Sequence, residues 1–172
     1  DIRLVEFHSK ANALTDESME IVAAAAADHG RGIIVHNDAQ HFSAGVDLTA
    51  VLALIRDQDW SGIDAFLTRF QDAVAAMRDA PVPVIAAPSG LAIGGGFEVI
   101  VHADEVIPYV YPVFGLVEAA VGVVPRGGGV QETMRRWLDA TNDPAEAAWK
   151  TWMQIGYART GTSPEESAKM QY

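Results

Sequence analysis

The stretch PVIAAPSGLAIGGGFE, from Pro83 to Glu98, decides the fold of this chain. Val84 to Ala87 form a short apolar run that is typical of a strand buried on both faces, and Pro88 ends it. Gly94 to Gly96 follow, directly before a second apolar run, Phe97 to Val101, which we expect to begin a helix. The sequence therefore predicts a buried strand and a helix joined through a turn of glycines.

The glycine turn leaves backbone N–H groups bare at the start of the predicted helix. The first N–H groups of a helix have no partner inside it, and the helix dipole favours negative charge there. A carbonyl oxygen could be held at this point as an oxyanion, with the Glu98 carboxyl about one helical turn further along. The other interpretation is structural: a tight turn that lets the helix pack closely on the strand. The stretch alone leaves both open.

The rest of the chain alternates strand and helix patterns. Further strands are expected at Ile2 to Phe7, Gly32 to His36 and Glu105 to Val110. Helices are expected at Thr15 to Ala26, Ser61 to Arg78, Gly129 to Leu138 and Pro144 to Ile155, and from Ser163 onward. Lys10 to Leu14, Asn37 to Gly45 and Phe114 to Glu118 are expected to be loops or turns. This order predicts an α/β fold with a largely parallel sheet, in one domain that spans residues 1–172.

Composition narrows the possible functions. The formal net charge of −11 argues against nucleic acid and against an anionic membrane as partners. There is no cysteine, so we expect a reducing compartment, the cytoplasm. The five histidines show no metal-ligand spacing, so no metal site is expected. The apolar run Pro81 to Val101 contains prolines, glycines and Glu98, and these favour a buried strand, turn and helix over a membrane span.

Signatures of several other enzyme classes are missing from the sequence. There is no G-x-S-x-G nucleophile elbow and no G-x-x-x-x-G-K-[ST] phosphate loop. Neither glycine cluster, Gly94 to Gly96 or Gly127 to Gly129, completes the dinucleotide-binding pattern G-x-G-x-x-G.

Three blocks, in this order, resemble the signatures of the crotonase superfamily, the enoyl-CoA hydratase/isomerase proteins. They are HFSAGVDL (His41 to Leu48), GLAIGGGFE (Gly90 to Glu98) and FGLVEAAVGVVP (Phe114 to Pro125). FHSKANAL (Phe7 to Leu14) resembles the family's first loop, which helps to hold coenzyme A. In detail the chain is most similar to the hydratase module of bacterial multifunctional fatty-acid oxidation proteins, which is fused to a 3-hydroxyacyl-CoA dehydrogenase. The resemblance covers nearly the whole chain and implies an α/β crotonase-like spiral of strands and helices.

The resemblance also implies an activity and a set of site residues. The activity is the reversible hydration of 2-enoyl-CoA to 3-hydroxyacyl-CoA in fatty-acid β-oxidation, with the coenzyme A thioester as substrate and no cofactor. The backbone N–H groups of Val46 and Gly95 would form the oxyanion hole, and Glu98 and Glu118 would hold the attacking water. The residues implied to contact coenzyme A are Lys10, Ala11, Phe42, Ser43, Ala44, Asp47 and Gly94.

The two glutamates are expected to divide the proton transfers between them. Glu98 lies near a helix N-terminus, which favours the carboxylate, so we expect it to act as the base on water. Glu118 lies in an apolar turn and is repelled by Glu98, so we expect it to donate the proton. Arg126 stands where the family has a small residue, and we expect its charge to lower the pKa of Glu118. Ser89 replaces an asparagine that is common in the family, and either residue suits a turn.

The family usually has a further strand before Asp1 and a strand and helices after Tyr172. The chain is therefore expected to be a core fragment that lacks both ends, held in a trimer-based homo-oligomer or joined to a dehydrogenase domain. Apolar surface is expected at Trp137, Trp149, Trp152 and Ile155. Two other functions stay open: an enoyl-CoA isomerase, which needs only the later carboxylate, and a non-catalytic module that binds acyl-CoA or a partner subunit. The presence of Glu98 favours the hydratase.

Overall fold

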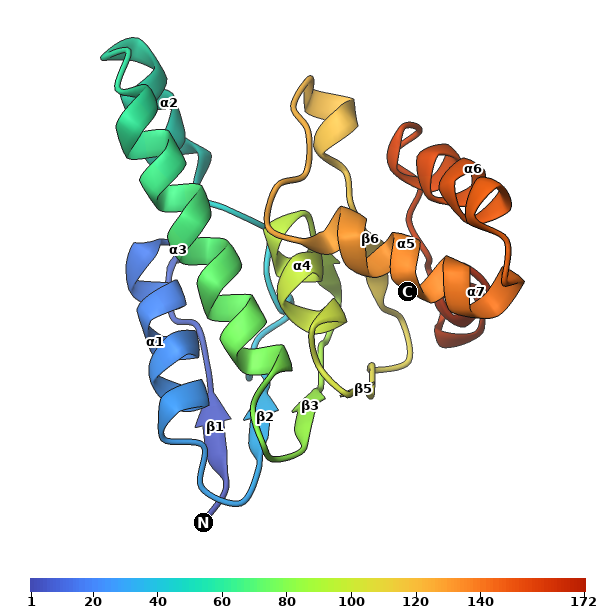
Figure 1. Ribbon diagram of the computed structural model, residues 1–172. Coiled ribbons are helices and arrows are strands. Elements are labelled where there is room, and N and C mark those ends of the chain that lie inside the picture. The colour runs from blue at the N-terminus through green and yellow to red at the C-terminus, as the bar shows by residue number, and fades with distance from the viewer.

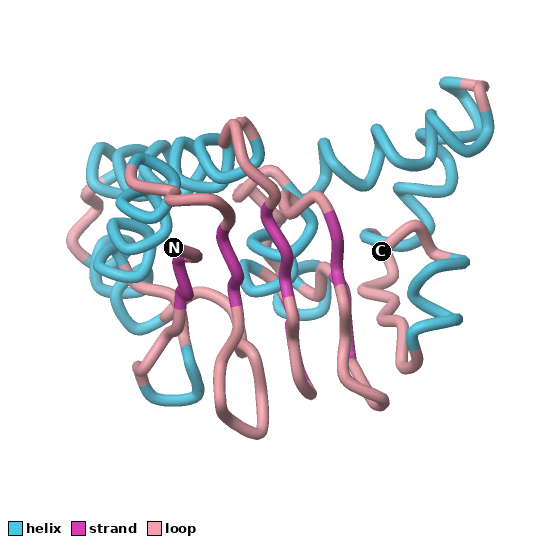
Figure 2. The backbone as a smooth tube through the Cα atoms, turned by 90° about the horizontal axis from the view of Figure 1, so that it is seen from below, coloured by secondary structure: helices cyan, strands magenta, loops and turns pink.

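The computed structural model describes all of residues 1–172, and its central feature is a four-stranded parallel sheet in the order β1-β2-β3-β5. Figure 2 shows these strands side by side. Short apolar runs supply the inner strands, in which alternate residues such as Ile33 and Val35 are fully buried. The strands are β1 (Arg3–Val5), β2 (Ile33–Val35), β3 (Val84–Ala86) and β5 (Glu105–Val106). The predicted parallel α/β architecture is confirmed.

Two long helices, α1 (Asp16–Ala27) and α3 (Trp60–Arg78), lie side by side against the sheet (Figure 1). Thr15 begins α1 as predicted, because its hydroxyl accepts a hydrogen bond from the backbone N–H of Ser18. The apolar face of α3, which includes Phe70 and Met77, is buried in the core. Both helices were predicted to within one or two residues at each end.

A second, two-stranded parallel sheet carries the segments that follow the predicted buried strand. It pairs β4 (Leu91–Ile93) with β6 (Val113–Gly115). No strand was predicted at β4. Residues 114–118 were predicted to be a turn, which is wrong for Phe114 and Gly115 because both belong to β6. Strand β5 is shorter than predicted because Pro88, which follows β3, has no N–H to donate to the carbonyl of Ile107 and so continue the ladder.

The remaining elements lie mostly in the second half of the chain. Helix α2 (Leu48–Arg56) was not predicted, although Asp47 caps it by accepting a hydrogen bond from the N–H of Thr49. The other helices are α4 (Gly95–Val101), α5 (Gly129–Thr141), α6 (Pro144–Ile155) and α7 (Pro164–Lys169), and the 3₁₀ helices are η1 (Lys10–Asn12) and η2 (Glu118–Val121). None of the helices is both long enough and apolar enough to span a lipid bilayer.

Only part of the expected apolar surface near the C-terminus is exposed. Trp149 and Trp152 stack on each other and are 61% and 53% exposed. Trp137 is half-buried, and its indole N–H donates to the side chain of Gln154. Ile155 is buried at 9% exposure. The prediction is therefore wrong for Ile155, because the last turn of α6 faces the core rather than solvent.

Phe42 provides a test of the core. Its side chain is fully buried and meets the ring of Phe7 edge to face, with the ring centroids 6.0 Å apart. We expect Phe42→Ala to lower the free energy of unfolding by about 3–5 kcal/mol, since it leaves a cavity in a close-packed site. Denaturant unfolding measures this change. Tyr111→Ala is the control, because Tyr111 is 78% exposed; equal losses in the two variants would contradict the placement of Phe42.

Candidate active site

Two neighbouring parallel strands bring the two predicted glutamates into one region. Ile93 at the end of β4 pairs with Gly115 at the end of β6. Beyond β4, Gly94 adopts a left-handed backbone conformation with φ +53° and caps α4, which carries Glu98. Beyond β6, the chain reaches Glu118 at the start of η2. The carboxyl ends of paired parallel strands meet at one edge, so residues 20 positions apart face the same cavity.

The Glu98 carboxyl is held by backbone groups of a second glycine turn. Its Oε1 accepts hydrogen bonds from the N–H of Gly127 at 2.7 Å and from the N–H of Gly129 at 3.0 Å. The side chain is only 3% exposed. A Cβ at residue 127 would overlap the Glu98 carboxyl, and one at residue 129 would lie 2.8 Å from Glu98 Cγ. Glycine is therefore required at both positions if the carboxyl is to reach these N–H groups.

The Glu118 carboxyl lies close to the first glycine turn and lacks a partner of its own. Its Oε1 is 3.1 Å from the place that a Cβ of residue 94 would occupy. Its Oε2 is buried and makes no hydrogen bond within the protein. A buried acceptor without a partner is costly in a folded protein. A water molecule or a substrate group that donates to Glu118 would satisfy this oxygen.

Burial dominates the acid–base properties of both glutamates. Desolvation raises the pKa of Glu98 to about 7, although the N–H groups of Gly129 and Gly127 act in the opposite direction; the nearby charge of Glu118 raises it as well. Burial also raises the pKa of Glu118. The expectation that the helix N-terminus keeps Glu98 readily ionised is therefore wrong, because the cost of removing a carboxylate from water exceeds that attraction.

Arg126 does not act on the pair as expected. Its side chain is exposed, and its backbone carbonyl accepts a hydrogen bond from the side chain of Gln71. The pKa of Glu118 is raised by burial, and Arg126 makes no ion pair with that carboxylate. The predicted lowering of the pKa of Glu118 is therefore wrong, since an exposed guanidinium is screened by water.

Val46 and Gly95, the two residues predicted to form an oxyanion hole, line the same cavity as the glutamates. Neither backbone N–H donates a hydrogen bond within the protein. The two segments are in direct contact: a Cβ on Gly45 would lie 3.6 Å from the Gly95 nitrogen, and one on Gly95 would lie 2.9 Å from Val46 Cγ2. Two unpartnered donors beside the carboxyls of Glu98 and Glu118 can bind a ligand oxygen that gains negative charge.

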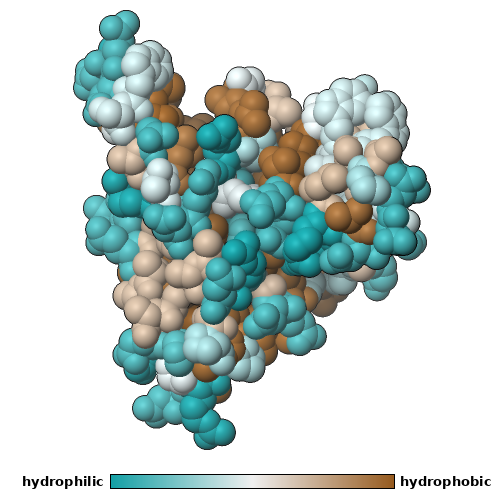
Figure 3. Space-filling model, viewed as in Figure 1, coloured by the Kyte–Doolittle hydropathy of each residue, from teal (hydrophilic) through white to brown (hydrophobic).

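The cavity has a volume of about 430 Å³, and its walls are mostly apolar. Figure 3 shows it as a hollow with hydrophobic sides, between the column formed by α2 and α3 and the lobe that carries η2. The apolar side chains come from three segments: Leu48, Val51 and Leu54 of α2; Ile63, Phe66, Leu67 and Phe70 of α3; and Val117, Val121, Val123 and Val124. Such a site suits a ligand that joins an apolar chain to one polar, reacting group.

The residues predicted to bind coenzyme A fall into two groups. Ala44 and Gly94 line the cavity, and Lys10, Ala11 and Asp47 lie at or near the surface outside it. The side chains of Phe42 and Ser43 are fully buried, and Ser43 Oγ donates to the carbonyl of Asn12 at 2.7 Å. Direct contact of these two side chains with a ligand is therefore excluded, and they support the loop from within.

Comparison with known proteins identifies the family of this chain. The profile of the family described as Enoyl-CoA hydratase/isomerase matches residues 2–151. The chain belongs to this family. Among curated members it is 32% identical, over 99% of its own length, to "Probable 3-hydroxyacyl-CoA dehydrogenase" of Bacillus subtilis, of which it covers 22%. It is also 32% identical, over 78% of its length, to "Probable enoyl-CoA hydratase" of the same organism, of which it covers 53%.

Solved structures share the fold. DspI of Pseudomonas aeruginosa superposes with a TM-score of 0.79 at 27% identity, over 98% of this chain and 62% of that chain. The enoyl-CoA hydratase of Bacillus anthracis gives a TM-score of 0.80 at 21% identity, over 98% and 64%. The crotonase-like fold is thereby confirmed, and the chain spans less than two thirds of the length of each of these proteins.

Sequence reasoning missed the residues that hold Glu98. Gly127 and Gly129 were noted only because their cluster fails to complete a dinucleotide-binding pattern. The available signal was a second run of glycines directly before a helix, the same pattern that indicated the first turn. The cavity-lining residues of α2 were also missed, because that helix was not predicted.

Glu98→Gln tests whether the buried carboxyl costs stability. A carboxyl whose pKa is raised in the folded state lowers the free energy of unfolding only where it is ionised. This loss of stability is absent below the ordinary pKa of 4.5 and grows as the pH rises to about 7. The amide oxygen of glutamine can still accept from Gly127 and Gly129. We therefore expect the variant to be more stable than the wild type by on the order of 2–3 kcal/mol at pH 8, and by clearly less at pH 5.

Thermal unfolding at both pH values measures the difference, with Glu20→Gln on the exposed side of α1 as the matched control. We expect the control to change the melting temperature little at either pH. A Glu98→Gln variant that is less stable than the wild type at pH 8 would show that the carboxylate contributes net stability.

Proposed function

We propose that this chain catalyses the reversible addition of water to a 2-enoyl-CoA thioester, giving a 3-hydroxyacyl-CoA as in fatty-acid β-oxidation. The observation that carries the proposal is the convergence of one buried carboxyl, one partly buried carboxyl and two unpartnered backbone N–H groups on one apolar cavity. The substrate is a coenzyme A thioester, and the reaction needs no other cofactor. Membership of the enoyl-CoA hydratase/isomerase family supports the reaction class.

The N–H groups of Val46 and Gly95 bind the thioester oxygen. Addition of hydroxide to C3 moves charge through C2 onto that oxygen, which becomes an enolate. Fixed donors stabilise this charge because they need no reorganisation during the reaction. The acyl chain then lies along the apolar walls supplied by α2 and α3.

Glu98 and Glu118 hold the water and share one proton near neutral pH. Two interacting carboxyls lose their protons in separate steps, because ionisation of the first opposes ionisation of the second. The ionised member takes a proton from water as the C3–O bond forms, and the protonated member donates its proton to C2. The unpartnered Glu118 Oε2 and the second oxygen of Glu98 are the atoms available to this water.

The coenzyme A end of the substrate lies outside the carboxyl pair. We assign Lys10, Ala11, Ala44 and Asp47 to the mouth of the site, together with Gly94 inside it. The net charge of −11 repels an anionic ligand at long range, so local contacts must supply the affinity. We further propose that in the whole protein this unit functions with a 3-hydroxyacyl-CoA dehydrogenase part, as the name of one relative indicates, and that it assembles as a trimer-based homo-oligomer.

The carboxyl pair is tested with Glu98→Gln and Glu118→Gln. Each substitution removes one acid–base group and keeps the shape, so we expect kcat to fall by roughly 10²-fold or more in each variant, with little change in Kd for the substrate. Loss of the enoyl absorbance of crotonyl-CoA and of longer 2-enoyl-CoA thioesters follows the reaction. Binding of acyl-CoA by the wild type without turnover would identify a non-catalytic module, and full activity in Glu98→Gln with isomerisation of 3-enoyl-CoA would identify an isomerase.

The oxyanion hole is tested with a matched pair at residue 95. Gly95→Ala and Gly95→Pro both crowd Val46 and Phe70, but only proline removes the N–H. Because one such donor contributes about 10²–10³-fold to kcat, we expect proline to reduce kcat at least 100-fold relative to alanine. Circular dichroism checks that both variants fold. Equal activity of the two folded variants would remove Gly95 from the oxyanion hole.

A further inference from the structure

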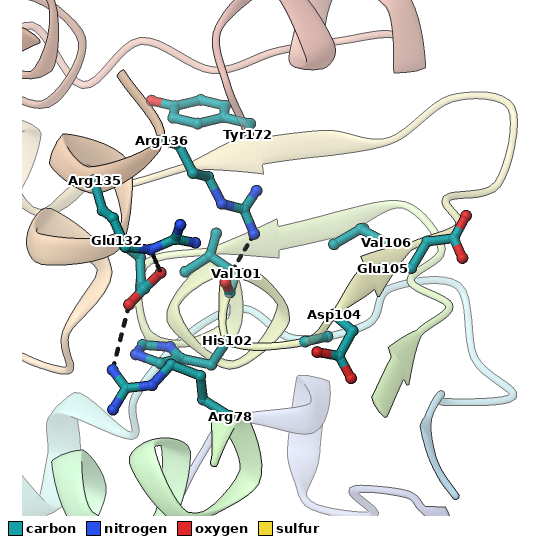
Figure 4. A pocket seen from close by; sticks show the side chains of 11 residues that line it. Arg78, Val101, His102, Asp104, Glu105, Val106, Glu132, Arg135, Arg136 and Tyr172 are labelled. Carbon is teal, nitrogen blue, oxygen red and sulfur yellow. Dashed lines mark hydrogen bonds and ion pairs between the residues drawn. The ribbon is translucent and has the colours of Figure 1, made fainter. Parts of the chain in front are cut away.

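A buried histidine lies directly behind the glutamate that the proposed reaction uses. His102 follows the last residue of α4 and is 5% exposed. Its Nδ1 is 2.6 Å from the backbone carbonyl oxygen of Glu98. Figure 4 shows the ring beside Arg78 and Glu132, in a pocket separate from the cavity that holds the carboxyl pair. His102 does not line the carboxyl cavity, so it does not touch the reacting atoms.

The carbonyl of Glu98 needs a partner from outside the helix. The last four carbonyls of a helix have no intrahelical donor, and α4 contains only seven residues. The backbone N–H of His102 bonds to Val99 and Ile100 instead. A carbonyl can only accept, so the short contact places a hydrogen on Nδ1. Burial lowers the pKa of His102, which favours this neutral form of the ring.

The other side of the ring contacts the turn that holds the Glu98 carboxyl. A Cβ on Gly128 would lie 2.9 Å from His102 Cε1 and 3.0 Å from its Nε2. Gly128 has φ +99°, a conformation that side chains disfavour. Its neighbours Gly127 and Gly129 donate the two hydrogen bonds to Glu98 Oε1. One imidazole therefore touches both the backbone of Glu98 and the turn that binds its side chain.

We propose that His102 is a positioning residue for Glu98. Its Nδ1–H fixes the Glu98 backbone while its ring supports the 127–129 turn, so that Oε1 stays on the two N–H groups and the second oxygen faces the cavity. A displacement of about 1 Å in a reacting group can cost about 10²-fold in rate. This inference rests on the proposed function, because it assigns His102 a part in that chemistry.

Burial is the main reason that the ring is neutral, and the charged groups around it act in both directions. Glu132 on α5 would attract a proton to His102, but it is buried and accepts from both Arg78 and Arg135. Asp79 beside the ring is paired with Arg78. Arg136 reaches the carbonyl of Val101, and its charge also opposes protonation of His102. Asp104 and Glu105 line the same pocket without a cationic partner, and neither makes a hydrogen bond with the ring.

Two substitutions distinguish the role of the His102 N–H donor from the role of the shape of its ring. His102→Phe keeps a ring under Gly128 and removes the donor, whereas His102→Asn keeps an N–H near the position of Nδ1. With crotonyl-CoA, we expect phenylalanine to lower kcat by about 10- to 100-fold with KM within about twofold, and asparagine to keep kcat within about threefold of the wild type. Arg136→Gln is the matched control, because it removes another side-chain bond to an α4 carbonyl without contact to Glu98; we expect kcat to be unchanged.

Imidazole ¹⁵N NMR of the wild-type protein gives a readout independent of activity and of any variant that fails to fold. We expect a neutral His102 ring at pH 7 with its hydrogen on Nδ1. A charged ring, or a neutral ring with hydrogen on Nε2, overturns the proposal, as does a folded His102→Phe variant with wild-type kcat. An equal fall in kcat for Arg136→Gln also overturns it. A wild-type protein that does not hydrate enoyl-CoA refutes the proposed function instead. The NMR result still shows whether His102 Nδ1–H donates to the carbonyl of Glu98.

Discussion

The Glu98 carboxyl accepts two backbone hydrogen bonds in a place that water barely reaches. Burial of a carboxylate is unfavourable unless hydrogen bonds compensate it, and here the donors come from Gly127 and Gly129, 29 and 31 residues further along the chain. The path of the chain from η2 to α5 must therefore return to α4. Burial and the like charge of Glu118 raise the pKa of Glu98, the two backbone hydrogen bonds lower it, and the result is about 7. This is the range in which a general acid or base functions best.

The two parallel sheets supply the geometry that this interaction needs. Pairing of β4 with β6 fixes the origins of both carboxyls at one sheet edge. Phe70 of α3 packs against both glycine turns, since a Cβ on Gly95 would lie 3.4 Å from its ring and one on Gly127 would overlap it. The same helix forms an apolar wall of the cavity. Helix α3 therefore connects the main sheet with the site.

Much of the fold could be predicted because its signals are local. The Thr15 cap and the alanine-rich run after it indicated α1, periodic apolar residues indicated α3, and the continuous run at Val84 indicated the buried strand β3. Strands β4 and β6 were missed because a strand of three residues is too short to show a period of its own. Glu98 and Glu118 were predicted from their motifs and line one cavity, but the expectation that Glu98 is readily ionised was wrong, because burial raises its pKa. His102 and the Gly127–Gly129 contacts depend on tertiary approach, which no spacing rule contains.

The central claim is that Glu98, which is buried, and Glu118, which is partly buried, form an interacting pair that retains one proton up to about neutral pH. The most direct measurement is a ¹³C NMR titration of the glutamate side-chain carboxyls, assigned with Glu98→Gln and Glu118→Gln. We expect one resonance to titrate near pH 7 and to disappear in the Glu98→Gln spectrum, while the Glu118 resonance shifts in that variant because its charged neighbour is gone. Titration of both carboxyls near their ordinary value of 4.5 would contradict the account.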